Sequence, residues 1–174
     1  MNHWEQLVEE WLDYRGYIVK CNVCVGALAH GGHAGEIDVA AFHPHTKHCL
    51  HIECSGDAES WGERRERFKR KFHIGREFFG KEVLPWLQDP RIEQWALVWS
   101  AGRGRETLDG VKIVTARMLY RNIARDVMKL KGNRIVPEKY SLLRTVQITM
   151  RLVGDSKRAL AEIAQEPLLL PAVV

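Results

Sequence analysis

Long apolar segments are missing from this 174-residue sequence, in which no run approaches the roughly 20 residues that span a bilayer. The opening MNHWEQLVEE also lacks the basic residues and apolar stretch that mark a secretory signal peptide. These two absences predict no membrane partner, and we expect a cytoplasmic protein. The hydrophobic fraction of 45% and the charged fraction of 28% are ordinary for a globular chain. We therefore expect a single domain with a substantial core.

Cysteine is scarce, with four in the chain, which argues against a disulfide framework. Cys21 and Cys24 have the spacing of a zinc knuckle, but they fall within YIVKCNVCV, which is typical of a strand. Residues three apart on a strand point to opposite faces, so buried, reduced thiols are favoured over zinc ligands. The histidine-rich stretches HGGH and HPHTKH match no zinc spacing. Zinc-finger and recognition-helix patterns are also missing, so nothing predicts base-specific reading of nucleic acid.

Positive charge is concentrated in one part of the sequence. The chain has a net charge of +4 and a pI of about 8.9. Residues 61–81 alone hold eight basic residues against three acidic ones. The eight are Arg64, Arg65, Arg67, Lys69, Arg70, Lys71, Arg76 and Lys81. Such a surplus on one helix is compatible with contact to phosphates, although a solvated helix face is the alternative.

Hydrophobic periodicity predicts an alternation of helices and strands. Helical spacing of apolar residues occurs at 2–15, 61–80 and 117–131. Strands are predicted at 17–25, 36–42, 48–55, 94–100 and 111–115, with a glycine-rich loop at 26–35. Residues 145–153 alternate in a way that favours a strand, although 140–150 also fit a helix, and 156–165 fit a short helix. This order predicts an α/β fold with a mixed central sheet flanked by helices.

Within this single domain, 1–174, we expect a core at about 3–115 and a C-terminal helical extension at about 116–174. The extension ends in the apolar tail PLLLPAVV, which we expect to pack on the domain or on a second copy.

Acidic residues alternate with apolar ones in the strands at 36–42 and 48–55. In GEIDVAAF, Glu36 and Asp38 share one face, and in CLHIECS, His51, Glu53 and Ser55 share the more polar face. A turn at the centre of HPHT places Glu36 opposite Glu53 and Asp38 opposite His51, which keeps Asp38 within cross-strand reach of Glu53. Carboxylates on a half-buried face repel each other unless a cation neutralises them, and Mg²⁺ prefers oxygen ligands. The pair therefore indicates a divalent-metal site, with a solvated edge hairpin as the alternative.

In this order, the motifs resemble the PD-(D/E)xK nuclease superfamily, which includes restriction endonucleases, Mrr-like enzymes and archaeal-type Holliday-junction resolvases. WEQLVEEWLDYRGYIV looks like the first helix and strand of Mrr-like members, GEIDVAAF like the Asp strand, and HIECSG like the Glu-x-Lys strand. The resemblance covers roughly residues 3–100 and implies a restriction-endonuclease-like three-layer fold.

The resemblance also implies roles for four acids. Asp38 and Glu53 would bind Mg²⁺ or Mn²⁺, Glu36 would be a further ligand or support one, and Glu5 would complete the site from the first helix. Glu5 also fits a capping box, and Glu9 is its alternative one turn later. His51, on the face of Glu53, is a candidate metal ligand or proton shuttle, with a surface or core-flanking histidine as the favoured interpretation.

Ser55 stands where the family has a lysine that orients the attacking water and stabilises developing negative charge. A serine hydroxyl carries no positive charge. In one interpretation the cation has moved to the following helix, where Lys69 or Arg65 lies nearest in sequence to the site. Arg65, Lys69 and Arg76 are expected on one flank of that helix, and Arg64 and Lys71 on the other. In the second interpretation catalysis is lost and the protein only binds nucleic acid.

We therefore expect a metal-dependent endonuclease that hydrolyses DNA phosphodiester bonds, acting as a homodimer if the tail pairs two copies. One alternative is a catalytically degenerate nuclease fold that serves as a nucleic-acid-binding or assembly module. Another is an unrelated α/β interaction protein. The candidate catalytic residues are Glu5, Asp38, Glu53, Ser55 and Lys69. The candidate DNA-binding residues are Arg64, Arg65, Lys69, Lys71, Arg76, Arg121 and Arg125, the last two belonging to a basic stripe on the helix at 117–131.

Overall fold

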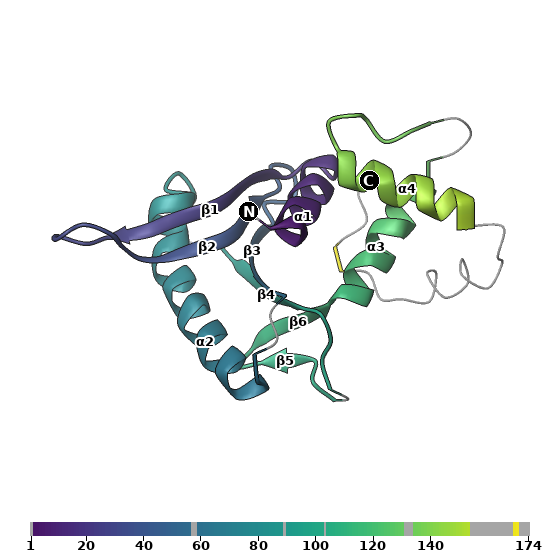
Figure 1. Cartoon of the computed structure of the whole chain (residues 1–174). Helices are drawn as coiled ribbons and strands as arrows, with labels where there is room; N and C mark the ends of the chain where they lie inside the picture. Colours follow the sequence, from purple (N-terminus) through teal and green to yellow (C-terminus); the bar gives the residue numbers. More distant parts are fainter. Residues whose placement is uncertain are drawn as a thin grey trace. The chain divides into compact units, whose positions relative to one another are not determined.

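A computed structural model describes residues 2–56, 59–88, 90–102, 104–130, 134–153 and 169–170 of the chain. The chain forms two compact units, Met1–Val114 and Thr115–Val174. The first unit contains a six-stranded mixed sheet flanked by helices, which confirms the predicted α/β class (Figure 1). Across the described ranges, no helix is both long and apolar enough to cross a membrane.

The strands of the sheet follow the order β1-β2-β3-β4-β6-β5. β1 pairs antiparallel with β2, β2 antiparallel with β3, and β3 parallel with β4. β5 and β6 form an antiparallel pair. Parallel neighbours need a long crossover connection, which α2 supplies between β3 and β4. The bounds are β1 (Ile18–Ala27), β2 (His33–Phe42), β3 (Cys49–Ser55), β4 (Ile92–Val98), β5 (Thr107–Leu108) and β6 (Val111–Thr115).

Two helices cover opposite faces of this sheet (Figure 1). α1 (His3–Tyr14) buries the apolar stripe that the sequence predicts, and Asn2 caps it. α2 (Trp61–Phe78) continues into a π-helical turn, η1 (Phe79–Val83). Phe72 and Phe79 pack against His51 of β3. The face of β3 that carries the predicted polar residues therefore lies under α2.

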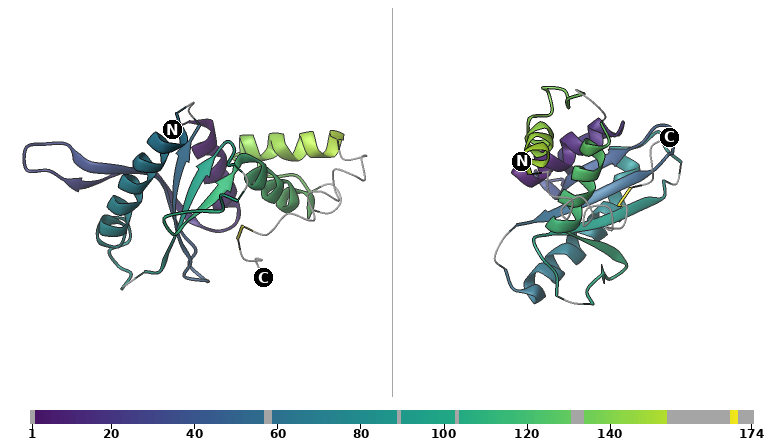
Figure 2. Two further views of the ribbon diagram at one scale, coloured as in Figure 1. Left: turned by 90° about the horizontal axis from the view of Figure 1, so that it is seen from below. Right: turned by 90° about the vertical axis from the view of Figure 1, so that its right-hand side faces the viewer.

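β1 and β2 form a longer hairpin than the sequence predicts. β1 runs to Ala27 and β2 begins at His33, so the predicted loop at 26–35 is wrong at both ends. Gly31 and Gly32 turn the chain with φ of 90° and 82°, which glycine adopts at little cost. β3 pairs with β2 only from Val39 onward. The far half of the hairpin therefore extends past β3 as a two-stranded ribbon (Figure 2).

The second unit contains α3 (Ala116–Met128) and α4 (Ser141–Val153). α3 confirms the helix predicted at 117–131. The strand favoured at 145–153 is wrong, because Leu143 and Gln147 are both buried and their spacing of four residues is helical. Gln147 Oε1 accepts the N–H of Val136 at 2.8 Å, which satisfies this buried amide. The helix predicted at 156–165 lies outside the described residues, as does most of the apolar tail.

Candidate functional site

Lys71 of α2 lies between two carboxylates of the sheet. Its Nζ donates to Asp38 Oδ1 of β2 at 2.5 Å and also to Glu53 Oε2 of β3. Asp38 is 6% exposed and Glu53 is fully buried, whereas the side chain of Lys71 is 25% exposed. The structure thus brings together the two acids that the sequence singles out and adds a cation to them.

The strand register explains why the two acids meet. Val39 of β2 pairs with Ile52 of β3 at the end of the ladder, and extending this register by one residue brings Asp38 opposite Glu53. The predicted register, in which Glu36 faces Glu53, is wrong by two residues. Side chains directly opposite each other on antiparallel strands are neighbours, so the two carboxylates share one site.

The connection between β2 and β3 accounts for that error. It comprises residues 43–48, and Lys47 adopts a φ of 57°, which is uncommon for a residue other than glycine. The turn is therefore centred one residue later than HPHT indicates. Glu36 is exposed and pairs with Cys24 of β1, so the structure leaves it outside the Asp38–Glu53 pair.

Each carboxylate has a second donor that fixes its orientation. Asp38 Oδ2 accepts the backbone N–H of Cys54 at 2.8 Å, and Glu53 Oε1 lies 2.6 Å from Nε2 of His51. On the other side of that imidazole, Nε2 of Gln94 lies 3.1 Å from Nδ1. The amide of Gln94 donates there, so Nδ1 accepts and the Nε2–H of His51 donates to Glu53. A chain of hydrogen bonds therefore runs from β4 through His51 to Glu53.

Gln94 is itself held by α2. Its Nε2 donates to the carbonyl of Phe72 at 3.1 Å, and its Oε1 accepts from Nη1 of Arg76 at 2.7 Å. Gly75 allows α2 to come this close, because a Cβ at that position would lie 2.1 Å from Cε1 of His51. His51 is fully buried, so a surface position is wrong, whereas its packing against Phe72 and Phe79 agrees with a histidine beside the core. Its contacts show that it orients Glu53.

Burial and charge act in opposite directions on this cluster. Burial raises the pKa of Glu53, while the hydrogen bond from His51 and the charge of Lys71 oppose that rise. Burial lowers the pKa of Lys71, but the charges of Glu53 and Asp38 outweigh burial and raise it. Lys71 is therefore positively charged, and it neutralises part of the negative charge of the two acids.

Glu5 on α1 is a third acid close to the end of β3. Burial raises the pKa of the Cys54 thiol, and the charges of nearby carboxylates, Glu5 among them, add to that rise. Glu5 Oε2 accepts the N–H of Asn2 at 3.0 Å, which confirms the predicted capping box. Glu9 lies beside Cys21, whose pKa is raised to about 12 by burial and by both glutamates. A catalytic role for Glu5 stays a prediction.

Ser55 accepts hydrogen bonds from two arginines of α2. Its Oγ lies 2.9 Å from Nε of Arg64 and 2.8 Å from Nη2 of Arg67. Ser55 is only 2% exposed. The position at which the resemblance implies a lysine thus holds a buried hydroxyl with two guanidinium groups above it.

Lys71, and neither Lys69 nor Arg65, is the cation that reaches the acids. Lys69 is exposed and its charge acts on Asp109, which forms an ion pair with Arg65 at 2.9 Å. Two residues along a helix turn a side chain by about 200°, so Lys69 and Lys71 lie on different faces. Gly75 is the signal that could have identified Lys71, because a glycine inside a helix marks a close approach and Lys71 lies four residues before it.

The other predicted DNA-binding residues have different surroundings. Arg76 contacts Gln94, as described above, while Arg121 and Arg125 lie half-buried on α3 of the second unit. Contact between any of them and nucleic acid stays a prediction.

Asp38 and Glu53 have the chemistry of a divalent-cation site. Their Oδ1 and Oε2 atoms both reach one ammonium nitrogen, so they converge on a common point. Mg²⁺ binds oxygen at about 2.1 Å and often takes only one or two carboxylates, with water and phosphate as the other ligands. Asp38 Oδ1 and Glu53 Oε2 are the atoms that would ligate such an ion in place of the Lys71 ammonium. Within the described residues, no group of three or more His, Cys, Asp or Glu side chains forms a ready metal cluster.

A second polar cluster lies on the other face of the sheet. The hydroxyl of Tyr17 is 2.8 Å from Nδ1 of His48, and Nε2 of His48 is 3.0 Å from Oε2 of Glu93. Oε1 of Glu93 accepts from Nε1 of Trp95 at 2.6 Å. Burial alone would raise the pKa of Glu93, but these hydrogen bonds and the charge of Lys112 lower it to about 2.

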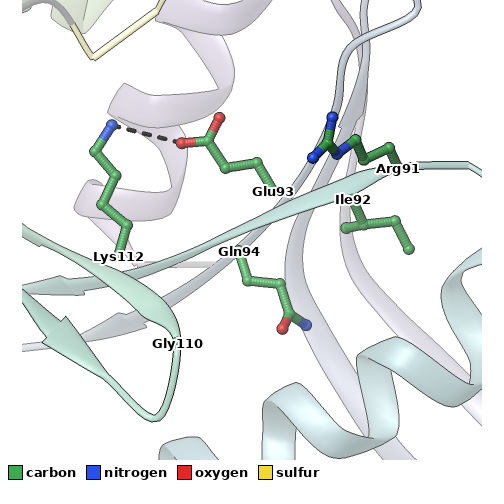
Figure 3. Close-up of a pocket in the computed structure, with 6 residues that line it drawn as sticks. All are labelled: Arg91, Ile92, Glu93, Gln94, Gly110 and Lys112. Carbon is green, nitrogen blue, oxygen red and sulfur yellow. Dashed lines mark hydrogen bonds and ion pairs between the residues drawn. The ribbon is translucent and has the colours of Figure 1, made fainter.

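Glu93 also lines a pocket of about 470 Å³ (Figure 3), together with Arg91, Ile92, Gln94, Gly110 and Lys112. Figure 3 shows Glu93 directed toward Lys112, at 3.5 Å, while Gln94 leaves β4 on the opposite side. The two faces of β4 therefore serve different clusters.

The lowered pKa of Glu93 makes a prediction about acid stability. A carboxylate with a folded-state pKa below its unfolded value stabilises the fold above the unfolded pKa and loses that effect as the pH falls. The free energy of unfolding should therefore fall between about pH 5 and pH 2, and Glu93→Gln should remove part of that fall. Urea unfolding at several pH values measures this free energy. Glu77→Gln, a change at an exposed glutamate, is the control. The prediction would be contradicted if the free energy of unfolding depended on pH in the same way in the wild type and in Glu93→Gln.

No protein-family model and no curated protein matches the chain. One solved structure, "Crystal Structure of Protein of Unknown Function AF1548", is similar with a TM-score of 0.42 and 14% sequence identity, over 88% of this chain and 98% of that chain. Any functional assignment therefore depends on the geometry of the site.

Proposed function

We propose that the first unit is a metal-dependent nuclease of the restriction-endonuclease-like fold that hydrolyses DNA phosphodiester bonds. The observation that carries this proposal is the convergence of Asp38, Glu53 and Lys71 on one point. Two acids on neighbouring strands and one lysine are the groups that the resemblance to PD-(D/E)xK nucleases implies. Here α2 supplies the lysine that position 55 lacks. The mixed sheet with its β3-α2-β4 crossover supports the same proposal.

In this proposal Asp38 and Glu53 would hold Mg²⁺ or Mn²⁺. When bound, the ion polarises a phosphate oxygen and lowers the pKa of a coordinated water. His51 and the N–H of Cys54 keep the two carboxylates in place. Lys71 leaves the carboxylates and places its ammonium where it can hydrogen-bond the attacking water or a phosphate oxygen.

Cleavage of supercoiled plasmid DNA by the full chain tests the proposal. We expect nicking with Mg²⁺ or Mn²⁺ and none after EDTA removes the metal. Asp38→Asn should also abolish nicking, because a neutral amide is a poor ligand for a hard cation. Asp13→Asn, which changes an exposed aspartate of α1, is the matched control and should keep activity. Plasmid that stays intact with the wild type and every divalent metal would contradict the nuclease proposal.

A second candidate is the catalytically degenerate fold that only binds nucleic acid. One observation favours it: the oxygens of Asp38 and Glu53 all have hydrogen-bond donors within the chain, namely Lys71, His51 and the N–H of Cys54. The cluster is therefore satisfied without a metal. DNA binding that survives Asp38→Asn, with no cleavage by the wild type, would select this candidate.

A further inference from the structure

An exposed tryptophan directly after β4 is stacked on a buried tryptophan of α1. Trp99 is 69% exposed, whereas Trp4 is 5% exposed. Their ring centroids lie 5.6 Å apart and their planes differ by 25°, which is a stacked arrangement. We call Trp4 and Trp99 the tryptophan stack. Because Trp4 covers one side of the Trp99 ring and this residue is still 69% exposed, the other side of the ring faces solvent.

The buried member of the tryptophan stack is well anchored. Trp4 belongs to the first turn of α1, and its backbone N–H donates to Oδ1 of the capping residue Asn2 at 2.9 Å. The ring of His3 meets its indole edge to face, with the centroids 6.2 Å apart. Trp4 therefore fixes the orientation of the Trp99 ring before any ligand binds, so little side-chain entropy remains to be lost on binding.

The tryptophan stack lies at the end of the sheet that carries the candidate site. β3 and β4 run parallel, and Glu53 pairs with Ala96. Trp99 follows Ala96 by three residues, which is about 10 Å along the strand. One short segment of a nucleic-acid strand can therefore contact both the Asp38–Glu53 pair and the exposed ring.

The two contacts belong to different faces of the sheet. Trp99 stacks on α1, whereas Glu53 contacts Lys71 of α2, and these helices cover opposite faces (Figure 1). A nucleic-acid strand that reaches both must therefore pass around the end of β3 and β4. Duplex DNA resists such a sharp path, since its persistence length is about 50 nm. A flexible single strand follows it at much lower cost.

The flat face of a nucleobase matches the exposed indole ring. Stacking of a base on an aromatic side chain is favourable whatever the base, because every base has a π-face. Inside a duplex both faces of a base are already stacked on its neighbours. The ring of Trp99 is therefore accessible only to a base that has left the duplex or was never paired.

We infer that Trp99 stacks on an unpaired base of the substrate, and that the substrate is DNA with a single-stranded segment. Trp4 is the positioning residue that holds the Trp99 ring. The inference rests on the proposed nuclease function, which supplies the nucleic acid and the neighbouring site. It specifies the form of the substrate, which the two acids and the lysine alone do not.

Binding without cleavage tests the base contact independently of catalysis. The probe is fluorescein-labelled oligothymidylate, followed by anisotropy in EDTA. Trp99→Leu should weaken binding about tenfold, because leucine keeps an apolar contact with Trp4 but offers no π-face. Trp99→Phe should stay within about threefold of the wild type, since phenylalanine also stacks. Trp86→Leu changes a tryptophan that is 59% exposed and precedes β4, at the other end of that strand, and as the matched control it should alter binding by less than about twofold.

A strand without bases separates stacking from phosphate contacts. The same oligonucleotide built from abasic sugars keeps every phosphate charge but has no base to stack. The wild type should bind it about tenfold more weakly than oligothymidylate, whereas Trp99→Leu should bind the two strands nearly alike. Relaxed, closed plasmid, in which the bases are paired, should compete poorly with oligothymidylate for the wild type at equal nucleotide concentration.

Three results would overturn the inference. They are oligothymidylate binding by Trp99→Leu that equals that of Trp86→Leu, wild-type binding of the abasic strand as tight as that of oligothymidylate, and equal competition by the relaxed plasmid. If Trp99→Leu lost self-association in sedimentation equilibrium and kept its DNA affinity, the ring would serve a contact between copies, and the inference would again be wrong. The nuclease proposal fails separately: oligothymidylate that binds through Trp99 but stays uncut with every divalent metal would contradict cleavage and retain the base contact.

Discussion

Replacing Lys71 by methionine is expected to lower the rate of DNA cleavage by about 100- to 1,000-fold, the usual cost of losing one preorganised charge-stabilising donor. Methionine keeps an unbranched apolar stem but removes the ammonium that lies between Asp38 and Glu53. Without that cation, and without metal, the two carboxylates repel each other and the free energy of unfolding should fall. Mg²⁺ should restore stability to the variant but not cleavage. Single-turnover cleavage and thermal unfolding, each with and without Mg²⁺, separate the two effects.

Lys69→Met is the matched control for this experiment. It makes the same change of charge two residues away, at an exposed position on another face of α2. Its cleavage rate should stay within about twofold of the wild type, as for most exposed charges. An equal loss of cleavage in both variants would assign the effect to net charge. Unchanged cleavage by Lys71→Met would contradict a catalytic role for Lys71.

Gly75→Ala is expected to destabilise the first unit by about 3 kcal/mol, at the upper end of the usual cost of overpacking a core. The added Cβ would lie 2.1 Å from Cε1 and 2.2 Å from Nδ1 of His51, well inside contact distance. His51 cannot yield easily, because Glu53 and Gln94 hold both of its ring nitrogens. The steric cost should therefore exceed the gain of about 1 kcal/mol in helix propensity that alanine brings. Urea unfolding followed by tryptophan fluorescence measures the change.

Gly62→Ala is the control on the same helix. Among the residues that the structure describes, the only atom that a Cβ at Gly62 would approach is Oγ of Ser60, at 4.0 Å, so alanine fits there. This variant should be as stable as the wild type or slightly more stable, because alanine favours the helix. If Gly75→Ala matched its stability, the close packing of α2 on His51 would be contradicted.

The sequence was sufficient to predict the two acids and the order of the elements around them. Period-2 alternation fixes the strand face of Asp38 and of Glu53 whatever the register is, and a two-residue error in register keeps that face. The register itself depended on Lys47, whose φ of 57° no local rule predicts for a lysine. The same error in register makes Glu36 a candidate ligand in the sequence: it has the side-chain alternation of Asp38, but it lies two residues too far along the strand.

The lysine could not be chosen from the sequence, because its selection depends on the rotation of α2 about its axis. Two candidates two residues apart differ by about 200° around the helix axis, so they lie on opposite flanks, and only the position of the packed face decides between them. Phe68, Phe72 and Gly75 define the packed face of α2, whereas Trp61 at its start is only half-buried. The strand favoured at 145–153 failed similarly, since short apolar alternation does not distinguish a strand from a helix.

Asp38, Glu53 and Lys71 all come from residues 38–71, which comprise one hairpin strand, its neighbour and the helix that follows. Bringing groups so near in sequence together costs little loop-closure entropy, and contacts of low sequence separation form quickly during folding. The candidate site is thus assembled by one short supersecondary segment, to which β4 adds Gln94 as an outside support. A segment this short would keep the two acids and the lysine together if it were inherited as a block, provided that the neighbouring strand supplied a support equivalent to Gln94.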